Sequence, residues 1–153
     1  MMSRNQNLGM VLLLVVAAFV AGVSIGGEPT LRRLSLAGRS DDRPFSHAVV
    51  AGDTIYVAGT IGIDPETGAP PLDPMAEARL ALDGIKAKLE LAGATMDDLV
   101  RVEVFCPDLS LYGDFNEVYR TYFDTGYPAR AFIGSGPLLR GGRFEVSGIA
   151  VKR

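Results

Sequence analysis

The sequence predicts an α+β domain in which a single sheet carries two helices on one face. The first observation is the order of elements that the apolar pattern indicates, β-β-α-β-α-β-β. The second is the spacing of the apolar residues, which is helical in two segments and alternates in the strand between them. The third is length, because the part of the 153 residues that follows residue 28 is enough for one ordinary domain only.

The first 28 residues predict a signal peptide or an N-terminal transmembrane anchor. The chain carries no charge from Leu8 to Gly27, and most of this run is apolar. A helix of about 20 residues just spans a bilayer core of ~30 Å, yet the most apolar part also has the length of a signal peptide's central region. Residues 29–42 read as a linker and residues 43–153 as the domain. We therefore expect an exported, periplasmic or membrane-anchored protein, with an anchor facing the cytoplasm as the alternative.

A β-hairpin opens the domain. Residues 46–50 and 54–58 are rich in β-branched and aromatic side chains, and the pair Gly52-Asp53 between them predicts a tight turn. A second turn is expected at residues 64–68, where Asp, Pro and Gly gather.

A helix is predicted from residue 73 to residue 93. Asp73 supplies an N-cap, Pro74 the first helical position, and Gly93 closes the run. Apolar residues recur between them at helical spacing, at Ala78, Leu82, Ile85 and Leu89. This helix should bury one stripe against the sheet.

The strand after this helix should be half-buried. Its alternation gives one face with Val100, Val102 and Val104 and another with Arg101, Glu103 and Phe105. A second helix is expected from about residue 111, with Phe115, Val118, Tyr119 and Tyr122 on one side. Strands at 130–133 and 143–151 complete the sheet, joined by a glycine-rich loop. Phe105 and Ile149 on the uncovered face predict contact with another subunit.

Composition excludes several classes of function. The net charge is −3, and no stretch combines clustered Lys and Arg with aromatics, so we expect no nucleic-acid partner. The only histidine is His47 and the only cysteine is Cys106, which rules out an internal disulfide and the usual zinc sites. We expect no metal or cofactor, and Cys106 to be a small buried residue.

From residue 43 onward, the chain resembles the RidA (YjgF/YER057c/UK114) family. The resemblance rests on stretches that recur in one order and spacing, at residues 43–48, 55–59, 89–93, 104–105, 115–119, 127–130 and 144–150. It implies a chorismate-mutase-like fold, a homotrimer whose centre is formed by three sheets, and a ligand cleft at each subunit interface. The implied activity is hydrolytic deamination of small imines and enamines (2-imino acids) to 2-keto acids and ammonia.

The resemblance also implies the site residues. Arg130, which follows Pro-Ala, matches the arginine that grips the substrate carboxylate, and Glu145 matches the glutamate that places or activates the attacking water. Asn116 matches an asparagine on the side of the cleft, and Gly59 a glycine of the substrate site.

Four positions depart from the deaminating members. Phe45 stands where a tyrosine is usual, Ala58 where a serine is usual, Thr60 where a glutamine is common, and Ala131 where a small polar residue is customary. Phe45 and Ala58 remain in the predicted substrate site. These replacements remove hydroxyl groups from the cleft, which puts the choice of substrate in question.

The chemistry suits these residue types. A guanidinium binds a carboxylate through two parallel hydrogen bonds, and a nearby carboxylate can hold a water and move its proton. Three other interpretations stay open at this point. Arg130 and Glu145 could form a cross-strand ion pair, the trimer could bind a small carboxylate without turnover, or the domain could serve to cluster membrane anchors.

Overall fold

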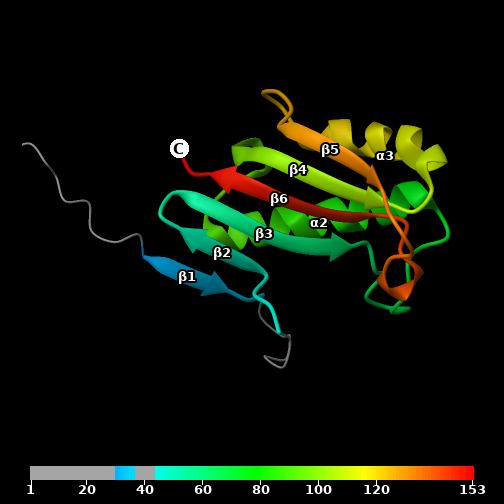
Figure 1. The fold of residues 1–153 in the computed structure, drawn as a ribbon, viewed down its shortest axis with the longest axis horizontal. Coiled ribbons are helices and arrows are strands. Elements are labelled where there is room, and N and C mark those ends of the chain that lie inside the picture. The colour runs from blue at the N-terminus through cyan, green and yellow to red at the C-terminus, as the bar shows by residue number, and fades with distance from the viewer. Residues whose placement is uncertain (1–29, 37–43) are drawn as a thin grey trace, which may run out of the picture.

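The computed structural model describes residues 30–36 and 44–153, which form one mixed sheet with two helices on one face (Figure 1). The strands are β1 (Leu31–Leu34), β2 (Ala48–Ala51), β3 (Thr54–Ile61), β4 (Leu99–Cys106), β5 (Ala129–Gly134) and β6 (Glu145–Val151). The helices are α2 (Pro74–Ala92) and α3 (Tyr112–Tyr119). The strand order is β1-β2-β3-β6-β4-β5, and only β4 and β5 pair in parallel. The predicted α+β fold is confirmed.

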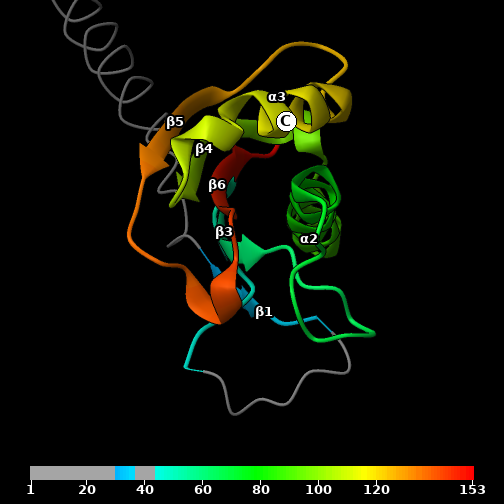
Figure 2. The same ribbon diagram turned by 90° about the vertical axis from the view of Figure 1, so that its right-hand side faces the viewer.

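The predicted signals set the bounds of α2. The Asp73 carboxylate accepts hydrogen bonds from the backbone N–H groups of Met75 and Ala76, and Gly93 ends the helix at a φ of 78°. Figure 2 shows α2 and α3 on the same side of the sheet, which curves around them. The core fills the space between the sheet and these helices and includes Cys106, as predicted.

One strand departs from its predicted pattern. Val102 and Val104 are buried as expected, but Val100 is exposed. The pairing of β4 with β6 shifts register between Leu99 and Arg101, so one extra residue of β4 bulges out at Val100. The bulge reverses the alternation, which explains why the predicted face was wrong at this position.

The segment predicted as a linker contains the edge strand β1, which pairs antiparallel with β2. Residues 1–29 and 37–43 lie outside the described residues, and with them the signal peptide or anchor predicted for residues 1–28. Among the residues that the structure does describe, none of the helices is long and apolar enough to cross a membrane.

The sheet face away from the helices is open in this chain. Phe105 and Ile149 lie there half-buried, and the Tyr56 side chain, paired with Ile149 across β3 and β6, is 50% exposed. Aromatic and aliphatic side chains on an open face suit contact with a second subunit, which stays a prediction.

Candidate functional site

Arg130 lies on the edge strand β5 and points toward helix α3. Its register partner on β4 is Val102, which is buried beneath the helices, so Arg130 shares the helix-facing side of the sheet. Its Nη2 donates a hydrogen bond of 2.7 Å to the Asn116 side-chain oxygen on α3. The structure thus brings together two of the residues that the sequence predicted.

Aromatic rings surround the Arg130 guanidinium. Its central carbon lies 4.5 Å from the Tyr119 ring centre, 5.7 Å from Tyr112 and 5.8 Å from Phe132. Such contacts attract the cation to the ring faces and hold its plane in place. We call Arg130, Asn116, Tyr112, Tyr119 and Phe132 the arginine half-site. Tyr112 was missed in the sequence, although it lies four residues before Asn116 and therefore on the same face of α3.

The two tyrosines of the arginine half-site differ in their chemistry. Burial raises the pKa of Tyr119 to about 12, and its hydroxyl has no hydrogen-bond partner among the described residues. The pKa of Tyr112 is lowered instead, first by a hydrogen bond with the Asn116 side chain and then by the charge of Arg130. The Tyr112 side chain is also 49% exposed. Tyr119 therefore packs beneath the guanidinium, while Tyr112 presents a polarised hydroxyl to solvent.

Glu145 begins β6 on the opposite face of the sheet. Its neighbours Phe144 and Val146 are buried toward the helices, so Glu145 points to the open face. A Cβ at Gly59 would lie 2.2 Å from the Glu145 Oε1. Gly59 therefore has to be glycine for the carboxylate to lie over β3. We call Glu145, Gly59 and Ala58 the glutamate half-site.

A buried lysine supports the glutamate half-site from beneath. The register of β3 against β6 shifts between Val57 and Thr60. Lys88, on α2 and buried, donates hydrogen bonds to the carbonyl oxygens of Ala58 (2.8 Å) and Gly59 (3.1 Å) and to the Thr60 hydroxyl (2.5 Å). The Thr60 hydroxyl thus binds Lys88 under the sheet. Lys88 escaped prediction because it occupies the stripe of α2 that reads as apolar.

Phe45 and Ala58 both contact His47. The Phe45 ring is half exposed and lies edge-on to the His47 ring at 6.1 Å, while the Ala58 backbone N–H donates to the His47 carbonyl oxygen. His47 itself is buried, and its Nδ1 accepts from the Leu36 N–H.

Within one chain, the two half-sites lie on opposite faces of the sheet. Strand β4 separates β5 from β6, and along β4 Arg130 pairs with Val102 whereas Glu145 pairs with Phe105. The interpretation of Arg130 and Glu145 as a direct cross-strand ion pair is therefore wrong. The sequence could not reveal this, because chain order does not give strand order.

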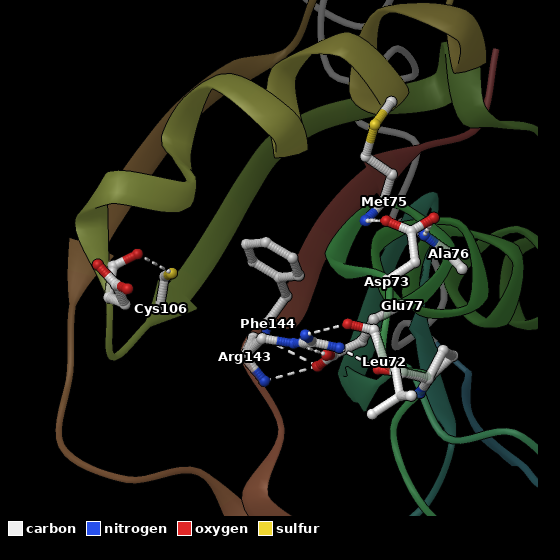
Figure 3. A network of polar contacts seen from close by, with 10 residues as sticks. Leu72, Asp73, Met75, Ala76, Glu77, Cys106, Arg143 and Phe144 are labelled. Carbon is white, nitrogen blue, oxygen red and sulfur yellow. Dashed lines mark hydrogen bonds and ion pairs between the residues drawn. The ribbon is translucent and has the colours of Figure 1, made fainter.

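Beyond the half-sites, the buried Glu77 and the partly exposed Arg143 form a network that the sequence did not single out (Figure 3). The Glu77 Oε1 accepts from the backbone N–H groups of Arg143 (2.6 Å) and Phe144 (3.2 Å), and its Oε2 from the Arg143 Nε (2.6 Å). This network fixes the chain directly before Glu145.

Comparisons with known proteins agree with this fold. A family model described as Endoribonuclease L-PSP matches residues 40–152. A mouse protein named 2-iminobutanoate/2-iminopropanoate deaminase is 38% identical over 110 residues, which cover 71% of this chain and 82% of the mouse chain. The crystal structure of RidA from an Antarctic Psychrobacter matches with a TM-score of 0.68 at 34% identity, covering 78% of this chain and 94% of its own. Escherichia coli TdcF, solved with bound serine, matches with a TM-score of 0.69 at 31% identity, covering 80% and 94%.

These comparisons correct the predicted location. We expected a protein outside the cytoplasm or held in a membrane. The relatives are instead named as deaminases of 2-imino acids, compounds that react with water and have to be met in the compartment that forms them. The prediction of an exported or membrane-anchored protein is therefore wrong.

The resemblance predicted from the sequence is confirmed by the family model, the related sequence and the solved structures. The matched residues span almost the whole described domain and include all of the predicted site residues, from Phe45 to Glu145. The chain belongs to the family described as Endoribonuclease L-PSP, which is the RidA family that its sequence motifs indicate.

Proposed function

We propose that this protein hydrolyses small 2-imino acids, and the enamines that tautomerise to them, to 2-keto acids and ammonia. The observation that carries the proposal is the Arg130 guanidinium, held by Asn116 and by aromatic rings at the rim of the sheet. Relatives named 2-iminobutanoate/2-iminopropanoate deaminase support an enzyme that acts on carbon–nitrogen bonds. The serine bound to TdcF, a small amino acid with a carboxylate, supports a ligand of this size and charge.

In the proposed reaction, Arg130 binds the substrate carboxylate and fixes the imine carbon next to it. Asn116 engages one guanidinium nitrogen, and the remaining N–H groups can form charge-assisted hydrogen bonds to the carboxylate. Glu145 holds a water and takes its proton as the oxygen bonds to the imine carbon. Glu145 passes this proton to the imine nitrogen, which gives a carbinolamine. It then takes the carbinolamine hydroxyl proton and delivers it to the nitrogen, so that the C=O bond forms, the C–N bond breaks and ammonia leaves. Positioning of this kind and proton transfer by a carboxylate both accelerate hydrolysis.

We further propose that each active site is shared between two subunits of a homotrimer. The arginine half-site and the glutamate half-site lie on opposite faces of the sheet in one chain, so a single ligand needs Arg130 from one subunit and Glu145 from another. The half-buried aromatic and aliphatic side chains of the open face support such an assembly.

The family description names an endoribonuclease, but the chain lacks the charge that RNA binding requires. Its net charge is −3, and it contains 15 Lys and Arg against 18 Asp and Glu. Affinity for nucleic acid rests mainly on cationic contacts to phosphates. We therefore base the proposed function on the deaminases among the relatives.

The test generates the substrate in place. A threonine dehydratase acting on L-threonine releases 2-aminobutenoate and 2-iminobutanoate, and semicarbazide competes with water for the imine. We expect residues 29–153 to increase the release of 2-oxobutanoate at the expense of the semicarbazone in proportion to protein concentration. Equal product yields with and without the protein would exclude this substrate and favour a trimer that binds carboxylates without turnover.

Replacing Gly59 by alanine tests the place of Glu145. An added Cβ at Gly59 would overlap the Glu145 carboxylate, so this side chain has to move off the sheet. We expect kcat/KM for 2-iminobutanoate to fall about ten-fold. This is the loss expected when a proton-transfer group is displaced but still functions in part. Gly113→Ala is the matched control, because nothing lies within 4 Å of a Cβ at Gly113. An unchanged rate in Gly59→Ala would remove Glu145 from the proposed mechanism.

A further inference from the structure

The hydroxyl of Tyr112 takes no part in the proposed reaction, yet it lies in the arginine half-site. Tyr112 begins α3, and its ring lies 5.7 Å from the Arg130 guanidinium and edge-on to the Phe132 ring at 5.0 Å. Nearly half of its side chain is exposed, in contrast to the buried Tyr119, which also contacts the guanidinium. The Tyr112 hydroxyl can therefore reach a molecule that Arg130 binds.

The hydrogen bonds around Asn116 decide which way the Tyr112 proton points. The Asn116 side-chain oxygen already accepts from Arg130. The hydrogen bond between Tyr112 and Asn116 lowers the pKa of the phenol and therefore stabilises the phenolate, so Asn116 donates its amide N–H to the phenol oxygen. A phenol that accepts from Asn116 keeps its own proton free to donate outward.

We propose that Tyr112 is a specificity residue that donates a hydrogen bond to the substrate atom attached to C2, which is the imine nitrogen of the substrate and the keto oxygen of the product. This inference rests on the proposed function, because it takes the carboxylate on Arg130 as its reference point. In a 2-imino or 2-keto acid, the C2 heteroatom lies only two bonds from the carboxylate carbon, so a donor beside the guanidinium fits it. A hydrogen bond there withdraws electrons from C2, which favours attack by water.

Tyr112 also supplies a hydroxyl donor that the other predicted site residues do not offer. Phe45 and Ala58 carry no hydroxyl, and the Thr60 hydroxyl is engaged by Lys88 beneath the sheet. A donor on α3 replaces them from the other half-site. The selectivity it gives is for ligands with an acceptor at C2 over plain carboxylates, because a donor left unpaired in the complex lowers affinity.

Two ligands separate this contact from the carboxylate contact. 2-Oxobutanoate and butanoate have the same carboxylate and chain length, and only the first has an acceptor at C2. Isothermal titration calorimetry of the full-length protein should show that Tyr112→Phe weakens 2-oxobutanoate about ten-fold and butanoate less than two-fold. Tyr122→Phe is the matched control, because its hydroxyl bonds Asp83 and the Arg79 carbonyl on α2, away from Arg130.

The pH dependence adds a second readout. Tyr112 donates only as the neutral phenol, and its pKa lies below the usual value of 10.0 because Asn116 and the positive charges of Arg130 and Arg120 stabilise the phenolate. The preference for 2-oxobutanoate should hold at neutral pH and disappear as the pH rises through this lowered pKa. In Tyr112→Phe, the remaining weak preference should not change over that range.

The outcomes distinguish this inference from the proposed function. If the unaltered protein binds neither ligand, the carboxylate site itself fails, and the assignment of Tyr112 fails with it. If both ligands bind and Tyr112→Phe weakens them equally or not at all, the hydroxyl makes no contact at C2, and only the role of Tyr112 is overturned. A selective loss for 2-oxobutanoate, absent in Tyr122→Phe, supports the proposal.

Discussion

Arg130→Ala should lower kcat/KM for 2-iminobutanoate by a factor of about 100 to 1,000. Charge-assisted hydrogen bonds from a guanidinium to a carboxylate are roughly twice as strong as neutral ones, and losing a pair of them corresponds to about 3 to 4 kcal/mol. The other members of the arginine half-site are Asn116 and aromatic residues, and none of them can replace the guanidinium. The semicarbazide competition assay measures the effect directly.

The matched control is Arg79→Ala. Arg79 is an exposed arginine on α2, whose carbonyl oxygen accepts from the Tyr122 hydroxyl, and its removal changes the net charge by the same amount. We expect this variant to keep the full rate. Loss of activity in both variants would mean that overall charge, and not a carboxylate contact, governs turnover. Full activity in Arg130→Ala would overturn the assignment of the substrate anchor.

Mixing two inactive proteins tests whether the site is shared. Arg130→Ala retains a native glutamate half-site, and Glu145→Gln retains a native arginine half-site. If the subunits are randomly mixed in trimers, roughly a quarter of the clefts receive Arg130 from one chain and Glu145 from the next. Co-expressed variants should regain about that share of activity, whereas two sites contained within single chains would regain none.

The elements with local signals were predictable from the sequence. The N-cap Asp73, the glycine at position 93 and the two-residue turn after β2 set their bounds through contacts within a few residues. The bulge at Val100 was not predictable, because it depends on how β4 pairs with β6, about fifty residues further along.

The site was predictable in its residue types but not in its arrangement. The family motifs singled out Arg130, Asn116 and Glu145, and the structure confirms the contact between the first two. The motifs could not show that β4 lies between β5 and β6, which divides the site between two faces. Lys88 and Glu77 were missed because each occupies a helix stripe that reads as buried, and each bonds to a partner far away in the chain.

Glu77→Ala should lower the free energy of unfolding by about 3 to 5 kcal/mol, the usual cost of removing one member of a buried ion pair. The Glu77 side chain is fully buried, and its two oxygens accept three hydrogen bonds from Arg143 and Phe144 (Figure 3). The variant leaves the buried Phe144 N–H unsatisfied and opens a space at the start of α2. Arg143 would also keep only its contacts to the carbonyl oxygens of Leu72 and Pro71.

The surface pair Arg101–Glu103 provides the control for Glu77. Its nitrogen–oxygen distance of 2.7 Å is similar to the 2.6 Å of the Glu77–Arg143 pair, but its side chains are 57% and 34% exposed, whereas Arg143 is 29% exposed and Glu77 is fully buried. Glu103→Ala should therefore cost about 1 kcal/mol or less. Urea unfolding at one protein concentration compares the two, since dissociation of an oligomer contributes equally to both curves. A loss below about 1 kcal/mol in Glu77→Ala would mean that burial adds nothing to this pair, and that β6 and Glu145 are held in place by the sheet alone.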